Sequence, residues 1–179
     1  GLSHKEVAEA MDMNVQSSMN LLSRSVSKLR EILATHSIMC ITFLGYDGMG
    51  LYDGCSMLNR LTYPFFHQNV FHAAINLWVL HQCLKARPCG IVDMVVFYLI
   101  AVSYYPSSSV PIIGLSGIVY AYMGYIAPFV EKKVRYNIII LSYICVGFFI
   151  PCMAVGIHIY CYVVGLLWGY LNSPICQDK

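Results

Sequence analysis

Six apolar runs, separated by short polar segments, follow the polar residues 1–31. Pro106, Pro111 and Pro151 lie between runs, where proline ends or kinks a helix. A bilayer crossing takes about 20 predominantly apolar residues. We therefore predict an all-α polytopic membrane protein with six transmembrane helices. The predicted spans are residues 32–46, 65–84, 91–105, 112–130, 136–150 and 155–171.

The composition supports this prediction. Of the 179 residues, 58% are hydrophobic and 11% are charged, against about 45–50% and about 25% in ordinary soluble domains. Residues 94–130 and 136–177 contain no Asp, Glu, Lys or Arg. An ordinary soluble globule is thereby excluded. The net charge of +2 is too small to indicate nucleic acid as the main partner.

The basic residues beside the runs predict an orientation, because cytoplasmic loops are enriched in Lys and Arg. If the chain crosses the membrane six times, nearly all of these basic residues lie on the same side of it. Both termini are therefore expected in the cytoplasm. Those on this side are Arg24, Lys28, Arg30, Lys85, Arg87, Lys132, Lys133, Arg135 and Lys179, whereas the opposite loops contain only Arg60.

The eight cysteines include no Cys-x-x-Cys pair, and most lie in apolar runs. They are expected to pack as small apolar side chains, the alternative being one disulfide or metal site. The first thirty residues lack the apolar core of a cleavable signal peptide. The sequence begins with Gly1 rather than methionine, so a fragment of a longer chain is considered beside a complete chain.

Polar side chains inside the apolar runs indicate where chemistry could occur. His72 and Asn76 are four residues apart on the second span, Ser116 lies near the start of the fourth, and His158 lies about one turn into the sixth. All are expected at similar depth below the same membrane surface. A serine becomes nucleophilic when a histidine takes its proton, and an imidazole and a carboxamide can stabilise the resulting oxyanion.

Each of these residues has a plain structural explanation when taken alone. An intramembrane serine often bonds to its own helix, and a lone histidine is as often structural as reactive. Their coincidence on alternate spans favours catalysis. Gly165 and Gly169 form a Gly-x-x-x-Gly pattern, which permits close helix packing in membranes.

These motifs together resemble the rhomboid family of intramembrane serine proteases, over residues 32–173. The resemblance implies that Ser116 is the nucleophile and His158 its general base, without cofactor or metal. It implies an oxyanion hole of His72, Asn76 and the Ser116 backbone N–H. Two departures, Cys161 where glycine is usual and Ile157 where alanine is common, bear on substrate fit and rate. The motifs that carry the resemblance are Arg60-Leu-Thr-Tyr-Pro-Phe-Phe-His67, His72-x-x-x-Asn76, Gly114-Leu-Ser116-Gly117, and His158 followed by Gly165-Leu-Leu-Trp-Gly169.

Residues 1–31 have the pattern of two short helices joined by a tight turn. Ser3 and Glu6 form a capping box, and Asn14 can cap the second helix. The segment resembles the promoter-reading helix-turn-helix of bacterial sigma factors, and the alternative is a cytosolic helical pair that only covers the membrane domain. The resemblance implies DNA contacts from Gln16, Ser17, Asn20 and Arg24.

The sequence thus predicts a helix-turn-helix-like segment (1–31), a six-span protease domain (32–173) and a cytoplasmic tail (174–179). The predicted function is cleavage of transmembrane protein substrates by a Ser–His dyad, in a bacterial inner (plasma) membrane. The partners are these substrates and the lipid bilayer, with DNA or RNA polymerase as partners of the first segment. The alternative function is a catalytically inactive membrane anchor or sensor for a DNA-binding transcription regulator.

Overall fold

A computed structural model describes residues 14, 16–17, 20, 23–24, 43–44, 47–107, 109–149 and 153–173. This part of the chain is mostly helical, as the all-α prediction requires. Two short strands, β1 (Phe43–Leu44) and β2 (Phe66–His67), pair in parallel. The α-helices are α3 (Met57–Thr62), α4 (Val70–Ala86), α5 (Ile91–Ser103), α6 (Ser116–Ile126), α7 (Lys133–Gly147) and α8 (Val155–Leu171). The 3-10 turns are η1 (Asp47–Met49), η2 (Tyr63–Phe65) and η3 (Ala127–Phe129).

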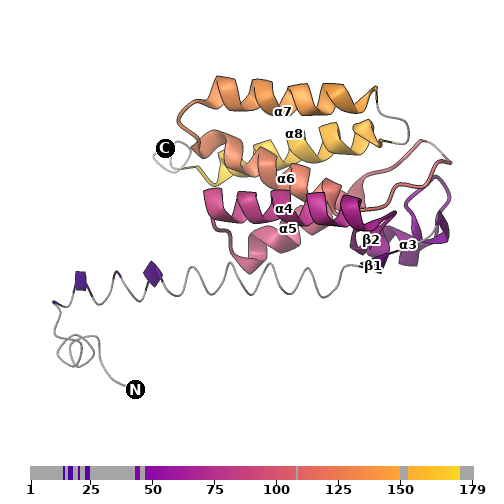
Figure 1. Cartoon of the computed structure of the whole chain (residues 1–179), viewed down its shortest axis with the longest axis horizontal. Helices are drawn as coiled ribbons and strands as arrows, with labels where there is room; N and C mark the ends of the chain where they lie inside the picture. The colour runs from indigo at the N-terminus through magenta and orange to yellow at the C-terminus, as the bar shows by residue number, and fades with distance from the viewer. Residues whose placement is uncertain are drawn as a thin grey trace, which may run out of the picture.

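The helices form a bundle in which α6 and α8 are central (Figure 1). Helix α7 lies along one edge, and α4 and α5 lie on the opposite side. Helix α6 packs most extensively on α8 and also contacts α4 and α5. The strands, α3 and the connection from α5 to α6 gather at one end of the bundle.

Three glycines allow α6 and α8 to approach until their backbones touch. A Cβ atom added to Gly165 would overlap the carbonyl of Ala121, and one added to Gly169 would overlap the carbonyl of Tyr125. On α6, a Cβ at Gly124 would overlap the carbonyl of Tyr162. The small-residue contact expected from the Gly-x-x-x-Gly pattern is therefore present in the bundle.

Two helices begin later than their apolar runs predict. Helix α4 begins at Val70 rather than at residue 65, because the Asn69 side chain accepts the backbone N–H of His72 at 2.9 Å and caps the helix there. Helix α6 begins at Ser116 rather than at residue 112. Ile112 instead pairs with Leu51 in an antiparallel bridge, and Gly114 has φ +121°, which favours glycine.

The other predicted spans coincide with α5, α7 and α8 to within a few residues. Most of the first predicted span, residues 32–46, lies outside the described residues, but Phe43–Leu44 form a strand where a helix was expected. Among the helices that the structure describes, none is both long and apolar enough to cross a lipid bilayer. The six membrane crossings and their orientation remain predictions.

The cysteines within the described ranges are free thiols, and two of the five pack in the core as expected. Cys83 and Cys161 are buried in the core, Cys55 and Cys89 are half-buried, and Cys145 is exposed.

Candidate active site

Ser116 and His158 are brought into hydrogen-bond contact by the packing of α6 on α8. Ser116 is the first residue of α6, and His158 lies one turn into α8. The distance from Ser116 Oγ to His158 Nε2 is 3.0 Å. This distance is within the range in which a histidine can take a proton from a serine hydroxyl. The two residues predicted to form the dyad are therefore adjacent.

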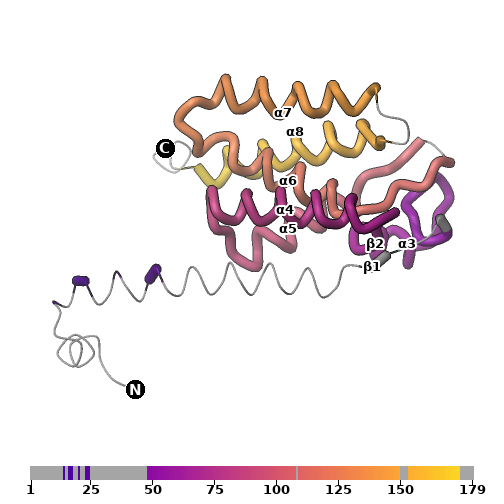
Figure 2. The backbone as a smooth tube through the Cα atoms, viewed as in Figure 1, coloured from indigo at the N-terminus to yellow at the C-terminus, as the bar shows by residue number. Residues whose placement is uncertain are grey.

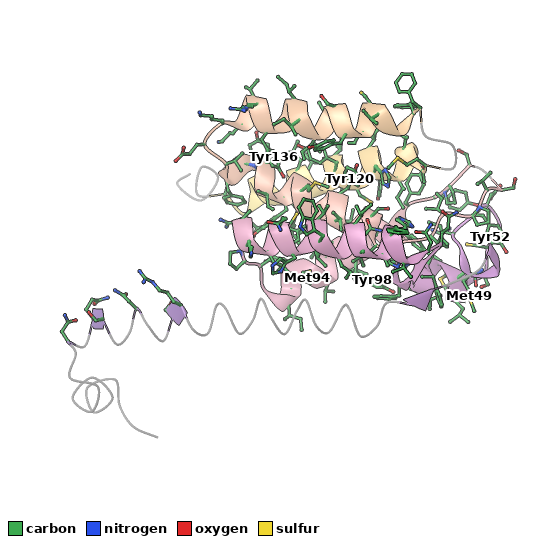
Figure 3. All side chains as sticks on the ribbon, in the orientation of Figure 1. Met49, Tyr52, Met94, Tyr98, Tyr120 and Tyr136 are labelled. Atoms are coloured by element: carbon green, nitrogen blue, oxygen red, sulfur yellow. The ribbon has the colours of Figure 1, made fainter. Side chains whose placement is uncertain are left out.

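Tyr120 fixes the plane of the His158 ring. The two rings are stacked with centroids 4.3 Å apart and planes 24° apart, and Figure 3 labels Tyr120 in the middle of the bundle. His158 is only 4% exposed. Tyr120 is not among the site residues predicted from the sequence. Its position four residues after Ser116 places it on the same face of α6, which is the signal that could have identified it.

A cavity of about 240 Å³ opens beside this pair. Its lining is mixed, with polar groups from α4, α6 and α8 and apolar side chains from α4, from α6 and from the loops before α6 and α8. The lining residues are Gln68, His72, Ile75, Asn76, Val79, Pro111, Ile112, Ile113, Ser116, Val119, Tyr120, Met123, Met153, Ala154 and His158. All four polar residues predicted from the spans therefore face one cavity.

His72 and Asn76 lie against the loop that precedes Ser116. A Cβ atom on Gly114 would lie 2.7 Å from His72 Cε1 and 3.5 Å from Asn76 Nδ2. Asn76 is 6% exposed, and its Nδ2 has no hydrogen-bond partner among the described residues. An unpaired buried donor is costly in a folded protein. Such a donor in a cavity beside a serine is suited to stabilising a developing oxyanion by donating a hydrogen bond to it.

His67 holds the loop before Ser116 from the other side. Its Nε2 accepts the backbone N–H of Leu115 at 3.2 Å, and its ring lies edge-on to His72 with centroids 5.1 Å apart. His67 is completely buried in the short strand before α4. Because a ring nitrogen accepts a hydrogen bond only when it carries no proton, His67 Nε2 is unprotonated in this contact.

Arg60 anchors α3 to the end of α5. Its Nη1 donates to the carbonyl of Tyr104 at 2.7 Å and to that of Val102 at 3.2 Å. These carbonyls belong to the last turn of α5 and the residue after it, where backbone acceptors lack helical partners. Arg60 thus contacts the helix end rather than the cavity. Gly117 contributes packing, since a Cβ there would lie 3.2 Å from Ala101 Cβ.

The four residues predicted to contact DNA are all described, whereas most of the segment around them is not. The Asn14 side chain accepts the backbone N–H of Ser17 at 2.8 Å, as the predicted helix cap requires. Gln16 Nε2 donates to Asn20 Oδ1 at 3.2 Å, and Arg24 is exposed. The rest of the predicted helix-turn-helix lies outside the described residues, so its DNA binding stays a prediction.

Comparison with known proteins points to one class of enzyme. No protein-family model matches the chain. The chain is similar to the rhomboid protease GlpG of Haemophilus influenzae, with 27% identity over 140 residues. The match covers 66% of this chain and 71% of the relative. This distant similarity to a protease is consistent with the Ser116–His158 contact. It gives weak support to the predicted resemblance to rhomboid proteases. The sigma-factor resemblance gains no support from it.

Proposed function

We propose that this chain is a membrane-embedded serine endopeptidase that cleaves transmembrane segments of other proteins. The observation that carries the proposal is the 3.0 Å contact between Ser116 Oγ and His158 Nε2 in a cavity lined by His72 and Asn76. The similarity to a rhomboid protease adds to it. The proposal assigns nucleophile, base and oxyanion donors to four side chains of the same cavity.

In the proposed reaction, His158 Nε2 takes the hydroxyl proton as Ser116 Oγ bonds to the scissile carbonyl carbon. The carbonyl oxygen becomes an oxyanion, which accepts hydrogen bonds from Asn76 Nδ2, His72 and the Ser116 N–H. The C–N bond then breaks, and the imidazolium returns its proton to the leaving amine. Water then attacks the acyl carbon as His158 takes its proton. The ester C–O bond breaks, Ser116 Oγ takes the proton back from His158, and the second product leaves as the carboxylic acid. The substrate helix must unwind locally, because its scissile carbonyl is otherwise bonded along the helix.

The side chains on the outside of the bundle support a lipid environment. Phe71 on α4, Ile91 on α5 and Phe149 after α7 are all more than 80% exposed. Many other large apolar side chains of α4, α5, α7 and α8 are also exposed. Soluble monomers rarely expose apolar surface on several adjacent elements. Within the proposal, these side chains face the hydrocarbon of a bacterial inner membrane.

Cleavage of a single-span reporter protein by the purified chain in detergent tests the proposal. The Ser116→Ala variant removes the nucleophile and is expected to abolish cleavage. Ser142→Ala is the matched control, because Ser142 is exposed on α7 and bonds only to the Ile138 carbonyl of its own helix. The control is expected to cleave at the wild-type rate.

Cleavage that survives in Ser116→Ala would overturn the assignment. Absence of cleavage in the wild type over a panel of single-span reporters would favour the inactive anchor or sensor. In that case, salt-sensitive binding of promoter DNA by the full chain would be the informative measurement for residues 1–31.

A further inference from the structure

The segment at Gly50 and Leu51 is hydrogen-bonded to the loop that precedes Ser116, the proposed nucleophile. The Leu51 N–H donates to the Ile112 carbonyl at 2.8 Å, and the Ile112 N–H donates to the Leu51 carbonyl at 2.9 Å. These reciprocal bonds form an antiparallel bridge between segments far apart in the sequence. Figure 2 shows both segments at the same end of the bundle. Leu51 is completely buried, so the bridge is shielded from water.

Gly50 packs against the same loop without space for a side chain. A Cβ atom at this position would lie 2.5 Å from Pro111 Cβ and 3.2 Å from Ile113 Cγ2. The backbone of Gly50 is not in the left-handed region, so any residue could adopt its conformation. The contact with residues 111–113 is therefore what excludes a larger side chain.

The loop is equally tight on its opposite side, where it meets the proposed oxyanion donors. Gly114 follows Ile113 directly, and a Cβ on Gly114 would lie 2.7 Å from His72 Cε1. The Gly114 N–H is held by the Tyr63 carbonyl at 3.2 Å. A shift of residues 111–113 therefore cannot be absorbed between Gly50 and His72. It would move Gly114 against His72 and Asn76.

We infer that Gly50 and Leu51 are positioning residues, which set the oxyanion hole through the loop of residues 111–114. This inference rests on the proposed function. The Ser116–His158 contact is held separately, by the close packing of α6 on α8. A change at Gly50 therefore weakens stabilisation of the transition state and leaves the Ser116–His158 contact unchanged.

The test compares the kinetics of Gly50→Ala with wild type on a single-span reporter in detergent. The number of intact active sites is counted by complete reaction of Ser116 with a fluorophosphonate. The kcat per titrated site is expected to fall between about tenfold and a hundredfold, since a displacement of about 1 Å can cost that much. The pH dependence of kcat/KM is expected to stay at the wild-type profile, because the Ser116–His158 contact is unchanged. A purely structural role would lower the number of titrated sites without changing kcat per site.

Two variants control for space and for general damage to the segment. Gly50→Ala combined with Pro111→Gly removes the atom that the new Cβ would meet, and is expected to recover kcat relative to Gly50→Ala. Gly54→Ala strains the backbone, since Gly54 has φ +76°, but its Cβ would meet nothing within 4 Å. This variant is expected to keep the wild-type kcat per site.

The inference would be overturned if Gly50→Ala kept the wild-type kcat per site. It would also be overturned if Gly54→Ala lost as much kcat per site as Gly50→Ala. If Gly50→Ala yields no titratable sites, Leu51→Ala is used instead, because it loosens the same contact without adding an atom. An unchanged kcat per site in Leu51→Ala would also contradict the inference. The proposed function fails separately: reporter cleavage that survives in Ser116→Ala contradicts the dyad whatever Gly50→Ala does.

Discussion

Gly165 on α8 lies directly against the backbone carbonyl of Ala121 on α6, with no space for a methyl group between them. This contact lies at the centre of the interface that brings His158 to Ser116. The separation of α6 and α8 there is set by backbone atoms rather than by flexible side chains. The dyad geometry therefore depends on glycine at this position.

Gly165→Ala is expected to destabilise the fold, because the added methyl group forces α6 and α8 apart. Overpacking of this kind costs roughly 1–3 kcal/mol, and more where backbone cannot move. Thermal unfolding in detergent measures the change. Gly90→Ala is the matched control, since a Cβ there would lie 3.9 Å from its nearest neighbour, Asp93 Oδ2. Equal melting temperatures for the two variants would contradict the close contact.

Asn76→Ala is expected to lower kcat by about 10²–10³, the usual effect of removing one oxyanion donor. KM should change little, because the donor acts on charge that develops in the transition state. Stability should also change little, since Asn76 Nδ2 has no hydrogen-bond partner among the described residues. Asn172→Ala, at the end of α8, is the control and should retain activity. A rise in KM without loss of kcat would place Asn76 in substrate binding instead.

Arg60→Met is expected to destabilise the junction of α3 and α5 by roughly 2 kcal/mol, because hydrogen bonds from a charged group are worth about 1.5–3 kcal/mol. Methionine retains apolar length but cannot donate to the Val102 and Tyr104 carbonyls. Denaturation of the variant in detergent measures the loss. Arg135→Met changes an exposed arginine and should leave stability near wild type. Equal stability of both variants and the wild type would contradict the role assigned to the Arg60 hydrogen bonds.

The sequence predicted the helices α4, α5, α7 and α8 because each apolar run is long and has clear polar boundaries. It also predicted that Ser116, His158, His72 and Asn76 would share one depth, since spacing within a span fixes position along a helix. The starts of α4 and α6 were wrong by several residues. An apolar run does not reveal that Asn69 caps a helix or that Ile112 pairs with Leu51, because these depend on hydrogen bonds that only the folded chain forms. The stacking of Tyr120 on His158 was missed for the same reason, as it needs two helices in contact.

The most direct measurement of the central claim is the site of reaction with a fluorophosphonate, which modifies only activated serines. The full chain in detergent is treated with the reagent, digested and analysed by mass spectrometry. The account predicts modification at Ser116 and none at exposed serines such as Ser142, and it predicts that His158→Ala abolishes the modification. Labelling at other serines, or labelling of Ser116 at an unchanged rate in His158→Ala, would contradict the dyad.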